Sequence, residues 1–149
     1  MILYLKLVPC YQIIIKFHMS IIKRFASMFS FENTLPESWQ EIEAEGDVKN
    51  ILQSSNEKPQ IIFKHSPSCS ISAMAKYEME SIDDSVFDTA DVNYVDVIRN
   101  RPLSQLIAHQ LDVRHESPQL IYIKDGEVKW HGSHSHVNGR VVNELIQSF

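Results

Sequence analysis

Residues 60–80 read QIIFKHSPSCSISAMAKYEME, and this stretch decides the fold. Its first five residues carry a continuous apolar run bounded by turn residues, which is typical of a strand covered on both faces. The polar loop HSPSCS follows. From Cys69 onward, apolar residues recur at the spacing of one helical face, which predicts a helix that ends before Asp83. These residues are Ile71, Met74, Ala75 and Met79. We therefore expect Cys69 between a buried strand and the first turn of a helix.

The sequence on either side of this stretch predicts further strands and helices. Strands are indicated at 39–42, 92–98, 119–124 and 127–131, and helices at 47–55, 101–111 and 138–149. We expect Asp47 to cap the first of these helices and Asp125-Gly126 to turn a hairpin. The resulting order, β-α-β-α-β-α-β-β-α, is that of a thioredoxin-like α/β domain. Such a domain has a mixed central sheet, helices on both faces, and here a C-terminal β-hairpin plus helix.

Composition narrows the class of protein. The chain has 149 residues, 44% of them hydrophobic and 22% charged, which is the profile of one soluble globular domain. The first 28 residues contain four bases and no acid, which leaves ten bases against 19 acids and a net charge of −9 for the rest. Because that part lacks the clustered cations that phosphate neutralisation demands, we expect no nucleic-acid partner.

The N-terminal part of the chain is expected to lie outside the domain. We divide the sequence into an extension, a polar linker and the domain itself, at 1–31, 32–38 and 39–149. Lys6 and Lys16 interrupt the apolar residues before any window reaches the length of a membrane span, and no cleavable signal is evident, so we expect no membrane partner. Two alternatives stay open: the native chain begins at Met19, without residues 1–18, or residues 19–29 form a basic helix on a membrane surface.

Cys69 is the candidate nucleophile. At the start of a helix, free backbone N–H groups and the helix dipole favour a thiolate, and Lys64, His65 and Lys76 are close in sequence as further support. The alternative is a buried, inert cysteine. The other cysteine, Cys10, lies far away in the sequence, which argues against a secreted, disulfide-stapled domain and favours the reducing cytoplasm.

Ser72 occupies the fourth position of the motif Cys69-Ser70-Ile71-Ser72, where a dithiol motif would have its second cysteine. A disulfide cannot close there, so Cys69 must pass its disulfide to another molecule. The Ser72 hydroxyl either donates a hydrogen bond to the thiolate or serves the loop and the helix cap.

Ser117-Pro118 comes directly before the first strand of the hairpin. A proline can begin a strand without the loss of a ladder hydrogen bond, and that is the simplest interpretation. In a thioredoxin-like fold, however, this position carries a cis-proline that faces the active cysteine, and the backbone of the residue before it pairs with the substrate. We therefore predict a cis Ser117–Pro118 bond and a substrate-binding role for both residues.

The sequence resembles the monothiol bacilliredoxin family, thioredoxin-like proteins of the bacillithiol redox system. The segments that carry the resemblance are FKHSPSCSIS (63–72), NRPLS (100–104) and VRHESPQLIYIKDGEVKWHGSH (113–134). The resemblance implies reduction of mixed disulfides between proteins and bacillithiol, with Cys69 as the attacking thiolate and Pro118 as the cis-proline. The sequence departs from the family pattern T-C-P-I-S at two positions, because Ser68 replaces the threonine and Ser70 replaces the proline.

The resemblance also implies the reaction partners. We expect no bound cofactor, with bacillithiol or another low-molecular-weight thiol as co-substrate. The partners would be S-thiolated client proteins and, for the resolving step, a small thiol or a dithiol reductase. Two alternatives remain: a general reductase that uses another small thiol, and a redox-inert thioredoxin-like binding module in which Cys69 only packs.

His131, His134 and His136 offer three imidazoles within six residues. Their spacing is that of a loop, without a helix or a complete cysteine set, so we expect no metal site. Trp130 is expected in the core of the hairpin, and the alternative is a role facing the substrate.

Overall fold

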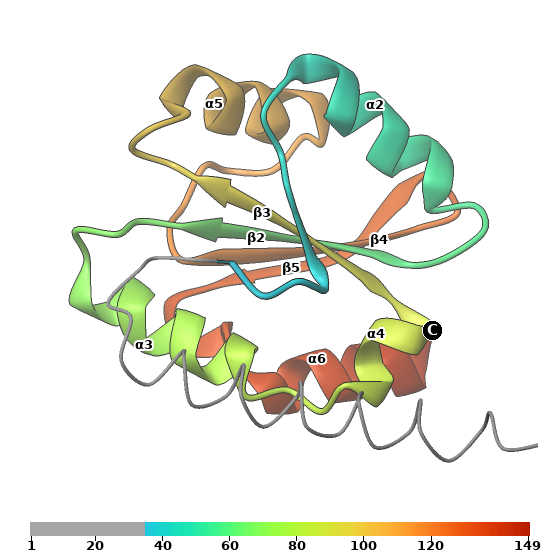
Figure 1. Cartoon of the computed structure of the whole chain (residues 1–149). Helices are drawn as coiled ribbons and strands as arrows, with labels where there is room; N and C mark the ends of the chain where they lie inside the picture. The colour runs from blue at the N-terminus through green and yellow to red at the C-terminus, as the bar shows by residue number, and fades with distance from the viewer. Residues whose placement is uncertain (1–34) are drawn as a thin grey trace, which may run out of the picture. The chain divides into compact units, whose positions relative to one another are not determined.

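The computed structural model describes residues 35–149, and Pro36–Phe149 form one compact unit (Figure 1). The expectations for the extension, which concern Cys10, the start at Met19 and the basic helix at 19–29, lie outside the described residues. No helix within 35–149 is long and apolar enough to cross a membrane.

A five-stranded mixed sheet forms the centre of this unit. Its strands are β1 (Trp39–Glu41), β2 (Gln60–His65), β3 (Asp91–Asp96), β4 (Gln119–Lys124) and β5 (Glu127–Ser133). The order across the sheet is β1-β3-β2-β4-β5, in which β3 pairs in parallel with β1 and β2. Strand β4 is antiparallel to β2, and β5 is antiparallel to β4. The predicted α/β class, parallel first strands and antiparallel hairpin are confirmed.

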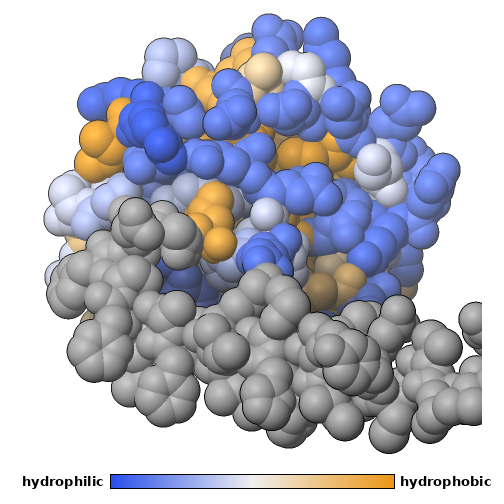
Figure 2. Space-filling view, in the orientation of Figure 1, coloured by the Kyte–Doolittle hydropathy of each residue, from blue (hydrophilic) through white to orange (hydrophobic). Residues whose placement is uncertain are grey.

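Helices cover both faces of the sheet, as Figure 1 shows. One face carries α2 (Glu45–Ser54) and α5 (Arg101–Gln110), and the other carries α3 (Ser70–Glu80), α4 (Ser85–Thr89) and α6 (Gly139–Ser148). A short 3₁₀ turn, η1 (His134–His136), joins β5 to α6. The visible outer surface of this unit is mainly hydrophilic, with scattered hydrophobic groups (Figure 2).

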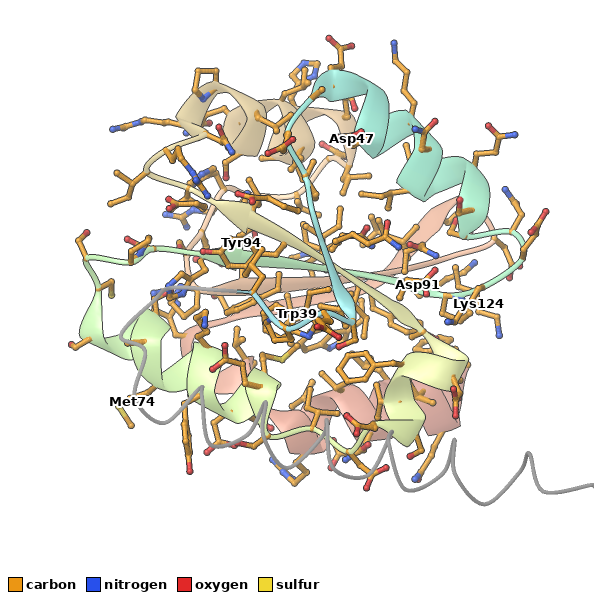
Figure 3. All side chains as sticks on the ribbon, in the orientation of Figure 1. Trp39, Asp47, Met74, Asp91, Tyr94 and Lys124 are labelled. Carbon is orange, nitrogen blue, oxygen red and sulfur yellow. The ribbon has the colours of Figure 1, made fainter. Side chains whose placement is uncertain are left out.

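Strand β2 lies at the centre of the sheet, and all six of its residues are buried. Because successive side chains of a strand alternate, Ile62 and Lys64 face α2 and α5, whereas Phe63 and His65 face the opposite layer. On that second side, Trp39, Tyr94, Phe63 and His65 form an aromatic cluster with ring centroids 5.7–6.3 Å apart. Figure 3 shows Trp39 and Tyr94 on the adjacent strands β1 and β3. Burial on both faces explains the continuous apolar run in the sequence.

The hairpin turn is formed as predicted. Asp125 and Gly126 both have positive φ, at 55° and 72°, which is the conformation that a two-residue type I′ turn requires. The turn is fastened to the end of α2, because Ser55 accepts hydrogen bonds from both residues, at 2.9 Å from Asp125 N and 2.8 Å from Gly126 N.

The prediction that Asp47 caps α2 is wrong. The helix begins two residues earlier, at Glu45, and its N-cap is Ala44. Asp47 lies in the first turn, and its Oδ2 accepts hydrogen bonds from the backbone N–H groups of Glu43 and Ala44, both at 2.9 Å. The carboxylate therefore stabilises the entry to the helix from inside it.

The predicted buried face of α3 is also partly wrong. Ile71 and Met74 are 52% and 72% exposed, and Figure 3 shows Met74 pointing away from the molecule. The buried residues are Ser72, Ala75 and Met79, which share a face at intervals of three and four. A serine belongs to this face because its hydroxyl has polar partners in the interior.

The structure also differs from the sequence prediction at the end of the third strand and in one further helix. The third strand ends at Asp96 rather than residue 98, because Asp96 Oδ1 accepts hydrogen bonds from Ile98 N and Arg99 N and turns the chain. Helix α4, with only five residues, was not predicted.

Candidate active site

Cys69 is the N-cap residue of α3 and has a free, half-buried thiol. Its own N–H donates to Ser66 O at 3.1 Å, and its carbonyl accepts from Ala73 N at 2.9 Å, which opens the helix. The sulfur is thus attached at the end of the helix where backbone N–H groups are free and the dipole is positive, and both features stabilise an anion.

Ser117-Pro118 lies at the same edge of the sheet as Cys69. Lys64 pairs with Gln119 in the antiparallel register of β2 and β4, so the chain leaves β2 toward Cys69 where it enters β4 from Pro118. The Ser117–Pro118 peptide bond is cis, as predicted, and Pro118 is buried.

The turn η1 meets the same edge. His134 N donates to Pro118 O at 3.0 Å, and η1 also packs near α3. Three segments therefore surround one end of the sheet: the loop 66–69 before α3, which we call the cysteine loop, the loop 114–118, which we call the proline loop, and η1. Such a meeting of loops on a rigid scaffold is a common place for binding and catalysis.

Ser72 is fully buried and supports the cysteine loop rather than the sulfur. Its Oγ accepts from Ser66 N at 2.9 Å and shares a hydrogen bond of 2.9 Å with His65 Nδ1. Among residues 35–149, no hydrogen bond joins Ser72 to Cys69. Of the two alternatives from the sequence, these contacts fit a role of Ser72 in the loop rather than a hydrogen bond to the thiolate.

His65 is buried within the aromatic cluster. Burial, followed by the positive charge of Lys76, lowers the pKa of His65 below its usual value of 6.5. The ring is therefore neutral at pH 7 and holds Ser72, and through it the backbone of Ser66, in place. Its support for Cys69 is indirect.

The two lysines near Cys69 in sequence have partners elsewhere. Lys64 is fully buried on the side of α5, where its Nζ donates to Ser104 O at 3.1 Å. Burial lowers the pKa of Lys64 to about 8. Lys76 forms an ion pair with Glu80, one helical turn along α3. Lys64 thus points to the face of the sheet opposite α3, because successive side chains of a strand alternate, and the charge of Lys76 is paired with Glu80.

The three histidines of β5 and η1 are exposed. Within residues 35–149, no three His, Cys, Asp or Glu side chains are grouped so that they could hold a metal ion. Trp130 is half-buried on β5 opposite Tyr122. Its ring lies over Gly132, where any side chain would collide with it.

Sequence reasoning missed a buried polar group behind the proline loop. Ser104 Oγ and His115 Nε2 share a hydrogen bond of 3.0 Å, and Gln119 Nε2 donates to Arg114 O at 2.9 Å. One signal was available: a lysine in a strand covered on both faces needs a polar partner inside the protein.

The sequence matches the profile of the family described as monothiol bacilliredoxin BrxC over residues 40–142. The chain belongs to this family. The match spans the sheet, the cysteine loop and the proline loop.

Solved structures support the same fold. A protein proposed to be an oxidoreductase with a thioredoxin fold is 27% identical, with a TM-score of 0.63 over 72% of this chain and 92% of its own. The thioredoxin Mala s 13 of Malassezia sympodialis is 19% identical, with a TM-score of 0.59 over 79% and 96%. Fasciola hepatica thioredoxin is 17% identical, with a TM-score of 0.58 over 72% and 96%. The fold is thioredoxin-like, and family and fold together support a thiol redox function.

Proposed function

We propose that this protein is a monothiol thiol-disulfide oxidoreductase that removes bacillithiol from protein mixed disulfides through the Cys69 thiolate. The observation that carries the proposal is the free thiol at the N-terminus of α3, at the sheet edge that also holds the cis Ser117–Pro118 bond. Membership of the bacilliredoxin family supports bacillithiol as the small thiol.

The reaction has two thiol-disulfide exchanges. In the first, the Cys69 thiolate attacks the bacillithiol sulfur of the mixed disulfide, a new S–S bond forms on Cys69, and the client cysteine leaves as a thiolate that takes a proton from water. In the second, the thiolate of a small thiol or of a dithiol reductase attacks the bacillithiol sulfur of the adduct and forms a new disulfide with it, and Cys69 leaves as a thiolate. The two electrons that reduce the client therefore come from the resolving thiol.

Different groups around Cys69 support different parts of the proposed reaction. The free N–H groups of α3 favour the thiolate, and the backbone of Ser117, before Pro118, offers a place for an extended segment of the client to pair. Ser72 and His65 hold the cysteine loop. Cys69 is the only cysteine among residues 35–149, so under this proposal the resolving thiol comes from outside that part of the chain, and a reducing compartment such as the cytoplasm would supply it.

Mass spectrometry of the full chain tests the proposal. Incubation with a bacillithiolated client should release the client thiol and leave one bacillithiol adduct on Cys69. Cys69→Ser should abolish transfer, because a hydroxyl at neutral pH is a far poorer nucleophile than a thiolate. A parallel client carrying a different small thiol measures the preference for bacillithiol.

Cys10→Ser is the matched control and should leave transfer intact. A block of turnover by Cys10→Ser, or a disulfide between Cys10 and Cys69, would instead make Cys10 the resolving thiol. A client that stays thiolated with the wild-type protein would favour the redox-inert binding module.

A further inference from the structure

A group of polar side chains lies inside the protein on the α5 side of the sheet, behind the proline loop. Lys64, Ser104 and Gln119 are all fully buried, and His115 is half-buried. Lys64 and Gln119 are direct partners in the register of β2 and β4, so their side chains point to the same face. We call these four residues the rear network.

Hydrogen bonds link the rear network to the two elements beside it. Lys64 Nζ donates to Ser104 O at 3.1 Å, which ties β2 to the first turns of α5. Ser104 Oγ and His115 Nε2 share a bond of 3.0 Å, which ties α5 to the proline loop. Gln119 Nε2 donates to Arg114 O at 2.9 Å, so the side chain at the start of β4 reaches back across the loop.

The loop 114–118 is therefore held from the interior at Arg114 and His115, and from outside at Pro118, whose carbonyl accepts from His134 N. Inside residues 35–149, Ser117 Oγ and Gln119 Oε1 are buried without a hydrogen-bond partner. These hydrogen bonds, together with the one between the Glu116 side chain and Ser133, set where the loop lies.

Stability alone does not account for the network. An ammonium in the interior without a carboxylate beside it costs free energy, and an apolar side chain would fill the place of Lys64 without that cost. What the polar residues add is a defined position of the loop relative to β2 and α5.

We propose that Ser104 and His115 are positioning residues that hold the backbone of Ser117 where the mixed-disulfide substrate pairs with it. This inference rests on the proposed function and deepens it. It assigns substrate recognition to a contact that lies behind the binding loop and touches neither the client nor the sulfur of Cys69.

Steady-state kinetics with a bacillithiolated client tests the proposal. His115→Leu and Ser104→Ala should each raise KM by about tenfold, the effect of one lost hydrogen bond, with kcat and the alkylation rate of Cys69 within about twofold of wild type. His115→Gln keeps a hydrogen-bonding group and should recover most of the loss. The double variant should be no worse than either single one, because both remove the same bond.

The control is His109→Gln, because His109 is an exposed histidine on α5, the helix that holds Ser104. Its KM and kcat should match those of the wild type. Unchanged KM in both His115→Leu and Ser104→Ala would overturn the proposal. Additive effects in the double variant, or a parallel fall in the alkylation rate of Cys69, would also overturn it, since either result indicates general damage to the fold.

Amide hydrogen exchange separates this inference from the proposed function. In His115→Leu and Ser104→Ala, the amides of residues 114–117 should exchange faster while those of β2 and β3 keep their protection. Unchanged exchange in the loop would overturn the inference whatever the activity. A wild-type protein that is inactive on every thiolated client would overturn the proposed function. Faster loop exchange in both variants would even then support the conclusion that the rear network fixes the position of the loop.

Discussion

Lys64 is a cation in the centre of the protein, and its titration is linked to folding. Burial lowers the pKa of Lys64 from 10.5 to about 8, so between these pH values the folded state binds fewer protons than the unfolded state. The free energy of unfolding therefore rises with pH over this window. Below about pH 8, the cost of the buried charge is fully present.

Lys64→Met should stabilise the protein at pH 7. It removes a burial cost of at most about 3 kcal/mol, and with the hydrogen bond to Ser104 O also lost, we expect a net gain of about 1–2 kcal/mol in urea unfolding. The rise of stability between pH 8 and 10.5 should also become smaller. Lys49→Met, at an exposed position on α2, is the control. Destabilisation by Lys64→Met at pH 7 would contradict the burial cost.

His65 makes the protein sensitive to acid. Since burial and Lys76 lower its pKa below 6.5, the folded state favours the neutral ring, and stability falls as the pH drops below 6.5. His65→Phe keeps an aromatic ring in the cluster and should reduce the loss of stability between pH 7 and pH 5, measured by thermal unfolding. An equal loss in both proteins would assign the acid sensitivity to other groups.

At the scale of the element, α3 separates two methionines that the sequence pattern placed on one face. Met79 is fully buried, whereas Met74 is 72% exposed. The apolar spacing of Ile71, Met74, Ala75 and Met79 fits a helical face, but the true face includes Ser72, whose partners are Ser66 and His65. A periodicity based on hydrophobicity alone does not count a buried serine.

Met79→Ala should destabilise the protein by about 2–5 kcal/mol, because it leaves a cavity in the core. Met74→Ala makes the same chemical change on the same helix and should alter stability by no more than about 0.5 kcal/mol. Chemical denaturation of both variants measures the difference. Similar losses would mean that α3 packs on the face that the sequence pattern indicated.

At the scale of the whole molecule, the sequence predicted what local patterns encode. The apolar run before Cys69, the dipeptide Asp125-Gly126 and the order of the elements were enough for the thioredoxin-like sheet and for the place of the cysteine and proline loops. Pairs such as Ser104 with His115 and Ser72 with His65 depend on tertiary packing, which no local pattern contains. The expectation that Lys64 supports Cys69 rested on closeness in sequence alone, but its side chain points to α5, on the face of the sheet opposite α3.

The single cysteine among residues 35–149 limits how much thiolated client one chain can repair at a time. Under the proposed mechanism, each folded chain accepts one adduct and then waits, so it behaves as a stoichiometric acceptor until a resolving thiol reaches it. In a sudden pulse of thiolated clients, the number repaired in the first round would equal the number of reduced copies present. The abundance of the protein would set the number of clients repaired in that first round. The supply of the resolving thiol would set the rate of every later round.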